Sequence, residues 1–464
     1  MRFLRALLLL AALPSAVWAH GGLKSSSPAR DARLVAPPRA LVLTFTEHSP
    51  LAVTRIRLLS ANGAAVELGP MEHLDGDSLR VVRAAISERL AAGSYTVEWQ
   101  TAGEDGHPVR GSFGFVVLEA AQPAAVSPAP LAPAAAVPVA AAPESLPTTA
   151  RFDAESWAYV LIRFLTFAGI VVLVGTVSFQ QLIVPRVAIY ADPDVPLGGL
   201  GAATDRAASV GRAAALLLGA AAFARLGAQS YAILGADALD LRNVASLLLD
   251  TKWGLSWFVQ IAGVLVVLYG ARRVRRVRGG AARGDAMVAL GTLMLAAVPA
   301  LSGHAASASS VRSLAIAADT LHVIGAGGWI GSLTVVLLIG LPAMWTLPAG
   351  VRERGVAALF RTFSPLALGF AGLLGLTGLF AAWIHLGSVG AIIESRYGLV
   401  LAVKLSLLSV VGATGFYNWR RVLPVLDQPA GTSRLRKSAG VELAVAVLVL
   451  IVTAVLVATP TPMD

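Results

Sequence analysis

The chain has 464 residues, of which 56% are hydrophobic and only 14% charged, and it carries a formal net charge of +10. This composition excludes a wholly soluble protein and is typical of a chain with several membrane spans. Cysteine is absent, which excludes disulfides, thiolate metal sites and a cysteine nucleophile.

Residues 1–19 have the pattern of a secretory signal peptide: two arginines, an apolar run and small residues before position 20. Cleavage after Ala19 makes His20 the first residue of the mature chain. Its free α-amine, the next backbone amide and its imidazole are nitrogen donors within chelating reach. Such donor sets suit Cu(II) in tetragonal geometry. An incidental histidine after a routine cleavage site is the alternative.

Residues 20–120 are predicted to form an all-β domain, a sandwich or small barrel. Short segments of alternating apolar residues are separated by Gly, Pro, Asn and Asp turn signals. The predicted strands are Leu41 to Phe45, Val53 to Leu58, Leu79 to Val82, Tyr95 to Trp99 and Ser112 to Val117.

The turn Glu104-Asp105-Gly106-His107-Pro108 carries the chemistry of this domain. Asp105 and His107 flank a glycine, a spacing that can aim a carboxylate and an imidazole at one point. Together with His20 they supply an amine, two imidazoles and a carboxylate, which favours Cu(II) over Cu(I). A plain hairpin turn remains the alternative, because Asp-Gly is itself a strong hairpin signal.

Several motifs extend this pattern: His20-Gly, Leu43-Thr-Phe-Thr-Glu47, Gly93-Ser-Tyr-Thr-Val-Glu-Trp99, and Asp105-Gly-His107 followed by Gly111-Ser-Phe-Gly-Phe115. With them, residues 20–118 resemble CopC, the periplasmic copper-binding β-barrel. The resemblance implies a cupredoxin- or Ig-like Greek key and Cu(II) bound by His20, Asp105 and His107, with Glu47 nearby. Of the family's Met-rich Cu(I) motif only Met71 and His73 remain, too few for a good soft-metal site.

Residues 121–150 contain 7 Pro and 12 Ala and a single charge, Glu144. This composition predicts a semi-rigid, extended linker without a packed core.

Residues 151–464 are predicted to form an all-α membrane domain. Eight apolar segments are long enough to cross a bilayer: 157–184, 208–234, 253–271, 286–303, 313–341, 363–386, 397–419 and 438–459. The secreted first domain and the arginine-rich loop 272–283 predict the same membrane topology. In this topology the loop is cytoplasmic and the C-terminus is periplasmic. This positive-inside pattern accounts for the net charge, so we expect no nucleic-acid partner.

Three histidines fall in the outer half of these spans: His304, His322 and His385. Asp319 lies three residues before His322, on the same helix face. Ionisable groups at this depth are costly and usually mark a site or pathway. We therefore predict a membrane copper site from His304, Asp319, His322 and His385. Unrelated interfacial histidines at positions 304 and 385 remain an equal alternative.

The membrane domain has further motifs: Leu301-Ser-Gly-His304, Asp319-Thr-Leu-His322 followed by Gly325 to Leu333, Tyr397 to Lys404, and Asn418-Trp-Arg420. Through them, about residues 155–460 resemble CopD, a multi-span inner-membrane copper protein. The whole chain thus resembles a CopC–CopD fusion in a YcnJ-like arrangement. The resemblance implies a bacterial cytoplasmic-membrane protein of copper uptake, homeostasis and resistance.

The leading hypothesis is periplasmic Cu(II) capture by the β domain and copper transfer into or across the inner membrane by the helical domain. The expected partners are the copper ion, the lipid bilayer and other periplasmic copper carriers. A b-type haem membrane oxidoreductase is the first alternative, because histidines on facing helices can ligate haem iron. A copper sensor or scaffold with a membrane anchor is the second. No phosphate-binding loop or nucleophile–base motif is visible, so we do not expect an enzyme.

Overall fold

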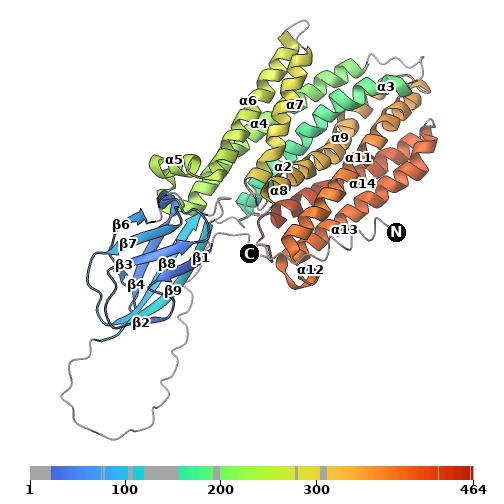
Figure 1. Cartoon of the computed structure of the whole chain (residues 1–464). Coiled ribbons are helices and arrows are strands. Elements are labelled where there is room, and N and C mark those ends of the chain that lie inside the picture. Colours follow the sequence, from blue (N-terminus) through green and yellow to red (C-terminus); the bar gives the residue numbers. More distant parts are fainter. Residues whose placement is uncertain are drawn as a thin grey trace, which may run out of the picture.

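In the computed structural model, a β-sandwich, called the head from here on, sits at one end of a bundle of long helices (Figure 1). The structure describes residues 22–74, 76, 79–102, 108–119, 156–191, 199–276, 281–303, 311–426, 428–459 and 461–462.

The head consists of two facing sheets, as the alternating segments predicted. The four-stranded sheet has the order β1-β3-β7-β6, formed by Leu23–Ser27, Ala40–Phe45, Val81–Ile86 and Leu68–His73. The five-stranded sheet has the order β2-β9-β8-β4-β5, formed by Ala32–Leu34, Pro108–Val117, Gly93–Ala102, Arg55–Ser60 and Ala65–Val66. Strand β2 runs parallel to β9, and the other paired strands are antiparallel.

The core of the head follows from strand alternation. In β3 the residues Leu41, Leu43 and Phe45 are buried, whereas the residues between them are half-buried. The ring of Trp99 from the opposite sheet meets Phe45 edge-on, with ring centroids 5.4 Å apart. Burying a large apolar side chain contributes about 1.5–3 kcal/mol, so this inner face holds the two sheets together.

The five predicted strands correspond to β3, β4, β7, β8 and β9, of which β4 and β7 begin later than predicted and the other three earlier. Val53 belongs to the 3-10 turn η1 (Leu51–Val53), so β4 begins at Arg55. Leu79 has a φ of +49°, which is incompatible with a strand, so β7 begins at Val81. The pattern also missed β1, because the sequence Leu-Lys-Ser-Ser-Ser has no apolar alternation and the strand is held by pairing with β3.

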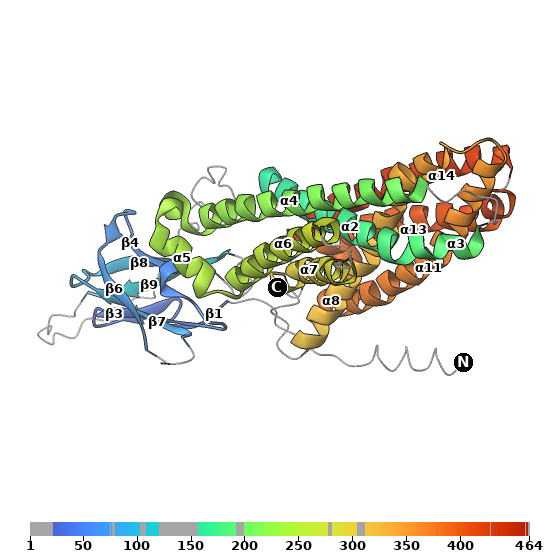
Figure 2. The ribbon, with the colours of Figure 1, turned by 90° about the horizontal axis from the view of Figure 1, so that it is seen from above.

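Within the described residues, eight helices are long and apolar enough to cross a membrane, which confirms the predicted number: Trp157–Val187, Gly199–Leu234, Lys252–Val274, Ala282–Leu301, Arg312–Met344, Val351–Leu386, Arg396–Val425 and Ser433–Leu456. They lie side by side in the bundle, which Figure 2 shows from above. The second span, helix α4, begins at Gly199, earlier than the predicted position 208.

Several spans are built from consecutive segments. Span one joins α2 (Trp157–Ser178), the π-helical turn η3 (Phe179–Ile183) and α3 (Val184–Tyr190). Span five joins α8 (Arg312–Ala326), η6 (Gly327–Gly331), α9 (Ser332–Val335), η7 (Val336–Gly340) and α10 (Leu341–Met344). Span seven joins α13 (Arg396–Tyr417), η8 (Asn418–Val422) and η9 (Leu423–Val425).

Single helices form the remaining spans: α4 (Gly199–Leu234), α6 (Lys252–Arg276), α7 (Ala281–Leu301), α11 (Val351–Leu386) and α14 (Pro429–Leu456). The connection between α4 and α6 contains η4 (Gly235–Leu239) and the short helix α5 (Leu241–Leu249). A further short helix, α12 (Ala391–Glu394), precedes α13.

Glycines allow the central helices to touch backbone to backbone. A Cβ on Gly175 of α2 would overlap the backbone of Gly331 in η6, and a Cβ on Gly331 would overlap the carbonyl of Val171. Small residues at such crossings are typical of membrane helix packing, where dispersion contacts replace the hydrophobic effect. This contact fixes span five against span one in the middle of the bundle.

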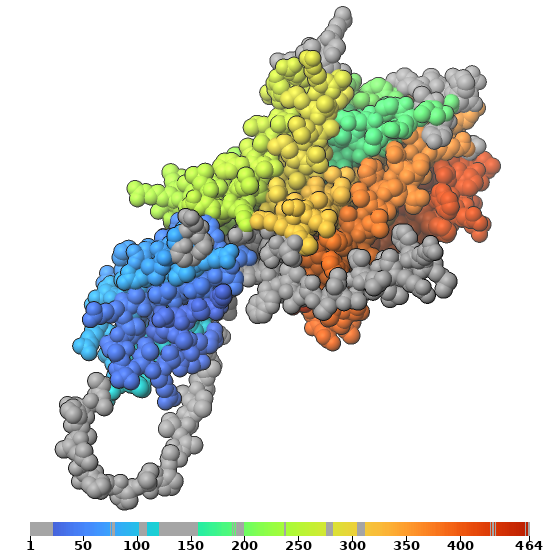
Figure 3. Space-filling model, in the orientation of Figure 1, coloured from blue at the N-terminus to red at the C-terminus, as the bar shows by residue number. Residues whose placement is uncertain are grey.

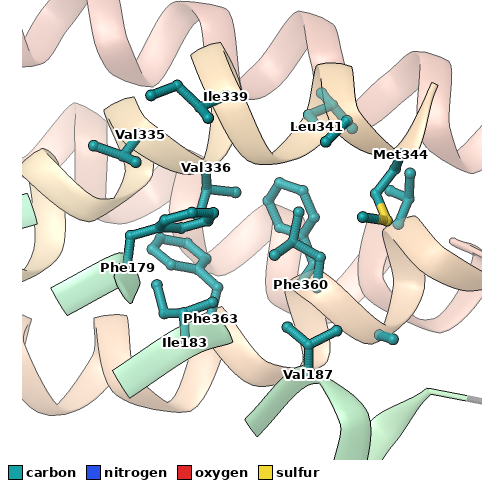
Figure 4. Packing of buried hydrophobic residues seen from close by; sticks show 14 of the residues in the cluster. Phe179, Ile183, Val187, Val335, Val336, Ile339, Leu341, Met344, Phe360 and Phe363 are labelled. Carbon is teal, nitrogen blue, oxygen red and sulfur yellow. The ribbon is translucent and has the colours of Figure 1, made fainter. Parts of the chain in front are cut away.

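The end of the bundle farther from the head is closed by a large apolar cluster, which we call the distal core. It includes Phe179, Ile183, Val336, Phe360 and Phe363, all at most 6% exposed (Figure 4). Met344, 1% exposed, lies in the same cluster and acts as a packing residue there.

Candidate functional site

A cavity of about 240 Å³ opens between the helices at the end of the bundle nearer the head. We call it the head-side cavity. Its walls are largely apolar, but ionisable and polar side chains from several spans project from them. They include Tyr159, Arg163, Arg225, Gln229, Asp319, His322, His385 and Lys404.

His322 of α8 is held in a defined orientation by α11. Its Nδ1 lies 3.0 Å from the Thr377 hydroxyl, whose own hydrogen is donated to the carbonyl of Leu373 at 2.7 Å. The hydroxyl must therefore accept from His322, so Nδ1 carries the proton and Nε2 keeps its lone pair. Gly378 makes room for the ring, since a Cβ there would lie 3.1 Å from Cε1. A neutral imidazole oriented this way is prepared to bind a metal through Nε2.

Asp319 lies one helical turn before His322 and interacts electrostatically with Lys404 of α13. The structure thus brings Asp319, His322 and His385 to one cavity, as their common depth in the sequence predicted. Among the described residues, however, no three His, Cys, Asp or Glu side chains lie close enough together to hold a metal ion. The three groups line a shared space without forming a closed coordination site.

Arg225 of α4 is buried on another wall of the same cavity. Its Nη2 donates to Ser256 Oγ at 2.8 Å and its Nη1 to Gln260 Oε1 at 3.4 Å. The guanidinium carbon lies 5.0 Å from the ring of Trp253. All of these contacts are with uncharged groups.

One end of the head faces the bundle. Described residues that are close in the sequence to the predicted copper ligands lie at this end. Gly22, two residues after His20, exchanges hydrogen bonds with Thr46, the neighbour of Glu47. Thr101, four residues before Asp105 in the sequence, bonds to Thr54 after η1 at 2.8 Å. Chain segments on either side of the predicted ligands therefore converge at the η1 end of the sandwich.

The η1 end is seated on α4, α5 and α6, where the surfaces of the head and the bundle meet (Figure 3). Val53 is fully buried in an apolar cluster with Ile233, Leu247, Trp253 and other residues of the bundle. Two hydrogen bonds accompany this contact: Gln100 Nε2 donates to the Ile233 carbonyl at 2.8 Å, and Arg55 to the Leu234 carbonyl at 3.4 Å.

Trp253 belongs both to the contact between head and bundle and to the wall of the head-side cavity. It is 2% exposed, packs in the cluster that holds Val53, and also lines the head-side cavity. The docked end of the head and the cavity are thus separated by little more than one side chain.

Several predicted features lie outside the described residues: the segment 1–19, His20, Asp105, His107, His304 and the linker 121–150. Glu47 is described. It is half-buried at the docked end of the head and interacts electrostatically with Lys252, the first residue of α6.

Sequence reasoning missed the supporting residues of the cavity. Thr377 and Gly378 lie in α11 without any motif that connects them to His322 in α8. Glu442, 5% exposed in α14, was also not a candidate, although its carboxylate accepts a hydrogen bond from Asn418 at 2.7 Å. The only usable signal for it was an acidic residue inside an apolar span.

Three domain families match the chain. Residues 23–118 match the CopC domain, residues 153–314 the copper resistance protein D-like N-terminal domain, and residues 357–456 copper resistance protein D. One polypeptide therefore combines CopC and CopD domains, and the chain is a membrane-integral member of the copper resistance and transport proteins.

Among individual relatives, the chain is 26% identical over 470 residues to the copper transport protein CutJ of Bacillus subtilis (strain 168), covering 98% of this chain and 77% of that protein. Copper resistance protein C of Xanthomonas campestris pv. juglandis is 33% identical, covering 23% of this chain and 87% of the relative. The crystal structure of CopC from Methylosinus trichosporium OB3b is 29% identical, with a TM-score of 0.20, covering 21% of this chain and 94% of that one.

Proposed function

We propose that the head captures Cu(II) in the periplasm and delivers copper to the head-side cavity, from which the helical domain moves it into or across the inner membrane. In this proposal Cu(II) binds to His20, Asp105 and His107, with Glu47 nearby. Asp319, His322 and His385 then receive copper in the cavity. Copper is the cargo of the protein, and no chemical conversion of another substrate is required.

The observation that carries the proposal is the shared position of Trp253. The end of the head bracketed by the predicted ligands docks beside the cavity that holds the oriented His322. A bound ion released at this end therefore enters a space lined by an imidazole nitrogen and a carboxylate, both suited to copper. The electrostatic contact between Asp319 and Lys404 gives the carboxylate a partner until copper arrives.

The test separates capture from transfer in the full chain. His20→Ala should abolish Cu(II) binding seen by electron paramagnetic resonance in the purified protein. Asp319→Asn and His322→Ala should leave that signal intact but abolish isotopic copper uptake into vesicles with the head outside.

Asp205→Asn is the matched control, because Asp205 is an exposed acid on α4 that does not line the cavity. It should preserve both binding and uptake. Unchanged uptake in the Asp319 and His322 variants would instead support the sensor or scaffold function, in which the bundle only anchors the head.

A b-type haem oxidoreductase remains a second candidate, because His322 and His385, from α8 and α11, line one cavity together with Arg163 and Arg225. Histidines can ligate haem iron, and arginines can meet its propionates. A Soret band in the purified protein that His322→Ala removes would support this function. A colourless protein that transports copper would reject it.

A further inference from the structure

Arg225 is a buried cation for which the described protein supplies no counter-charge. The residue is 7% exposed, and its printed contacts are the neutral side chains of Ser256, Gln260 and Trp253. Its Nε–H is buried and has no hydrogen-bond partner among the described residues. Burying an unpaired charge is strongly unfavourable, because neutral dipoles only partly replace the hydration that is lost.

The position of Arg225 keeps its charge away from the membrane–water interface. It lies nine residues before the end of α4 at Leu234, about 14 Å along the helix, and it lines the head-side cavity. A long side chain near a helix end can reach the interface, whereas this one is held inward by α6 through Ser256 and Gln260.

A second cation adds to the positive potential. Arg163 lines the same cavity, and the guanidinium groups of Arg163 and Arg225 are close enough to repel each other. Arg163 stacks over the ring of Tyr159 at 4.4 Å. Elsewhere in the cavity the carboxylate of Asp319 already interacts with Lys404. Two arginines, one from α2 and one from α4, therefore line the same cavity.

We propose that Arg225 binds a small monoanion, a halide or a carboxylate, in the head-side cavity. The guanidinium group of a cavity-lining arginine suits a small acceptor, either a halide ion or one oxygen of a carboxylate. The bound anion neutralises Arg225 and lowers the repulsion that Arg163 and Arg225 exert on a copper cation entering the same space. Anion binding itself does not require copper or the proposed transport function.

The test uses the purified full chain in a non-ionic detergent, with a chelator present to remove copper. Sodium sulfate, whose dianion lies outside the proposed class, is replaced stepwise by sodium chloride, and in a parallel series by sodium acetate, at constant ionic strength. Because a ligand that binds only the folded state stabilises it by mass action, the thermal midpoint should rise and saturate with the bound anion. The two series distinguish a halide from a carboxylate.

Arg225→Gln should weaken the apparent affinity at least about tenfold, since hydrogen bonds to charged groups contribute on this scale. Arg206→Gln is the matched control, because Arg206 is exposed on the same helix and does not line the cavity. It should behave as the wild type. An equal response in both variants would overturn the proposal.

Direct binding of radioactive chloride and acetate to the wild-type protein covers the case in which Arg225→Gln does not fold. Saturable binding at one site per chain that each unlabelled anion displaces would support the proposal. Absence of saturable binding of both anions would overturn it, and would leave the proposed copper transfer untouched because copper is absent.

Discussion

The two ends of the helical bundle differ in the kind of side chain they bury. The head-side cavity is lined by arginines, a lysine, an aspartate and histidines, whereas the distal core consists of aliphatic, phenylalanine and alanine side chains with one methionine. No residue of the distal core lines the cavity. Burying charge is costly in a bilayer, so the concentration of polar groups at one end indicates where the bundle handles its ligand.

The boundary between the two regions is sharp along span five. Ile330 lines the cavity, and Leu333, three residues later, belongs to the distal core. The crossing of Gly175 and Gly331 lies at the same level. An ion in the cavity therefore meets a close-packed apolar region, and passage across the bundle requires the distal helices to separate. In the pathway proposed above, the docked structure would be the state that receives copper.

Phe179→Ala should have the largest effect on stability. Phe179 is fully buried in the distal core, so the truncation should cost about 3–5 kcal/mol. Phe167→Ala is the matched control, because Phe167 lies on the same span but borders the cavity and is half-buried. We expect it to cost under about 2 kcal/mol. Thermal unfolding in detergent measures both, and equal losses would remove the distinction between the two ends.

Gly331→Ala should also destabilise the bundle, by roughly 1–3 kcal/mol or more, because the added methyl would overlap the Val171 carbonyl. Gly372→Ala on α11 is the control, since a Cβ there meets nothing within 4 Å. It should be neutral or slightly stabilising, as alanine favours the helix. Thermal unfolding with cross-linking of spans one and five would measure the change. Similar behaviour of the two variants would contradict the backbone crossing.

Thr377→Val should have the smallest effect on stability and a specific effect on copper. Valine keeps the shape but removes the acceptor for the His322 Nδ1–H, so the tautomer with its proton on Nδ1 and its lone pair on Nε2 is no longer selected. Loss of such an orienting group typically weakens metal binding by at least about tenfold. Copper uptake at limiting concentrations measures this loss.

Thr362→Val provides the control for that variant. Thr362 is buried on the same helix, but its hydroxyl bonds only to its own helix, at the Ala358 carbonyl. Its uptake should match the wild type. Equal defects in the two threonine variants would mean that the hydroxyls matter for the helix and not for His322.

Much of this architecture could be predicted because it rests on local patterns. Continuous apolar segments located all eight spans, and alternation in segments such as Leu41 to Phe45 located the principal strands. The common depth of Asp319, His322 and His385 also followed from counting residues along the spans. The residues 20, 105, 107 and 304 stay predictions.

The remaining features depend on contacts between distant segments. The tautomer of His322 depends on Thr377, 55 residues away, and the docking of Val53 depends on residues of α4 to α6. Arg225 was recognisable in the sequence as a charge within a span. That its contacts in the described part of the chain are with neutral groups became visible only when the neighbouring helices were in place.

The two hydrogen bonds from Gln100 and Arg55 to the last carbonyls of α4 have a consequence for dissecting the protein. Helix ends leave carbonyl groups without partners inside the helix, and here the sandwich supplies two of the missing donors. The sandwich therefore caps the C-terminus of α4, a transmembrane helix in another part of the chain. In a bundle expressed without the sandwich, we expect α4 to fray at its C-terminal end, within about three turns of Arg225. The isolated bundle would therefore differ in structure from the bundle in the full chain.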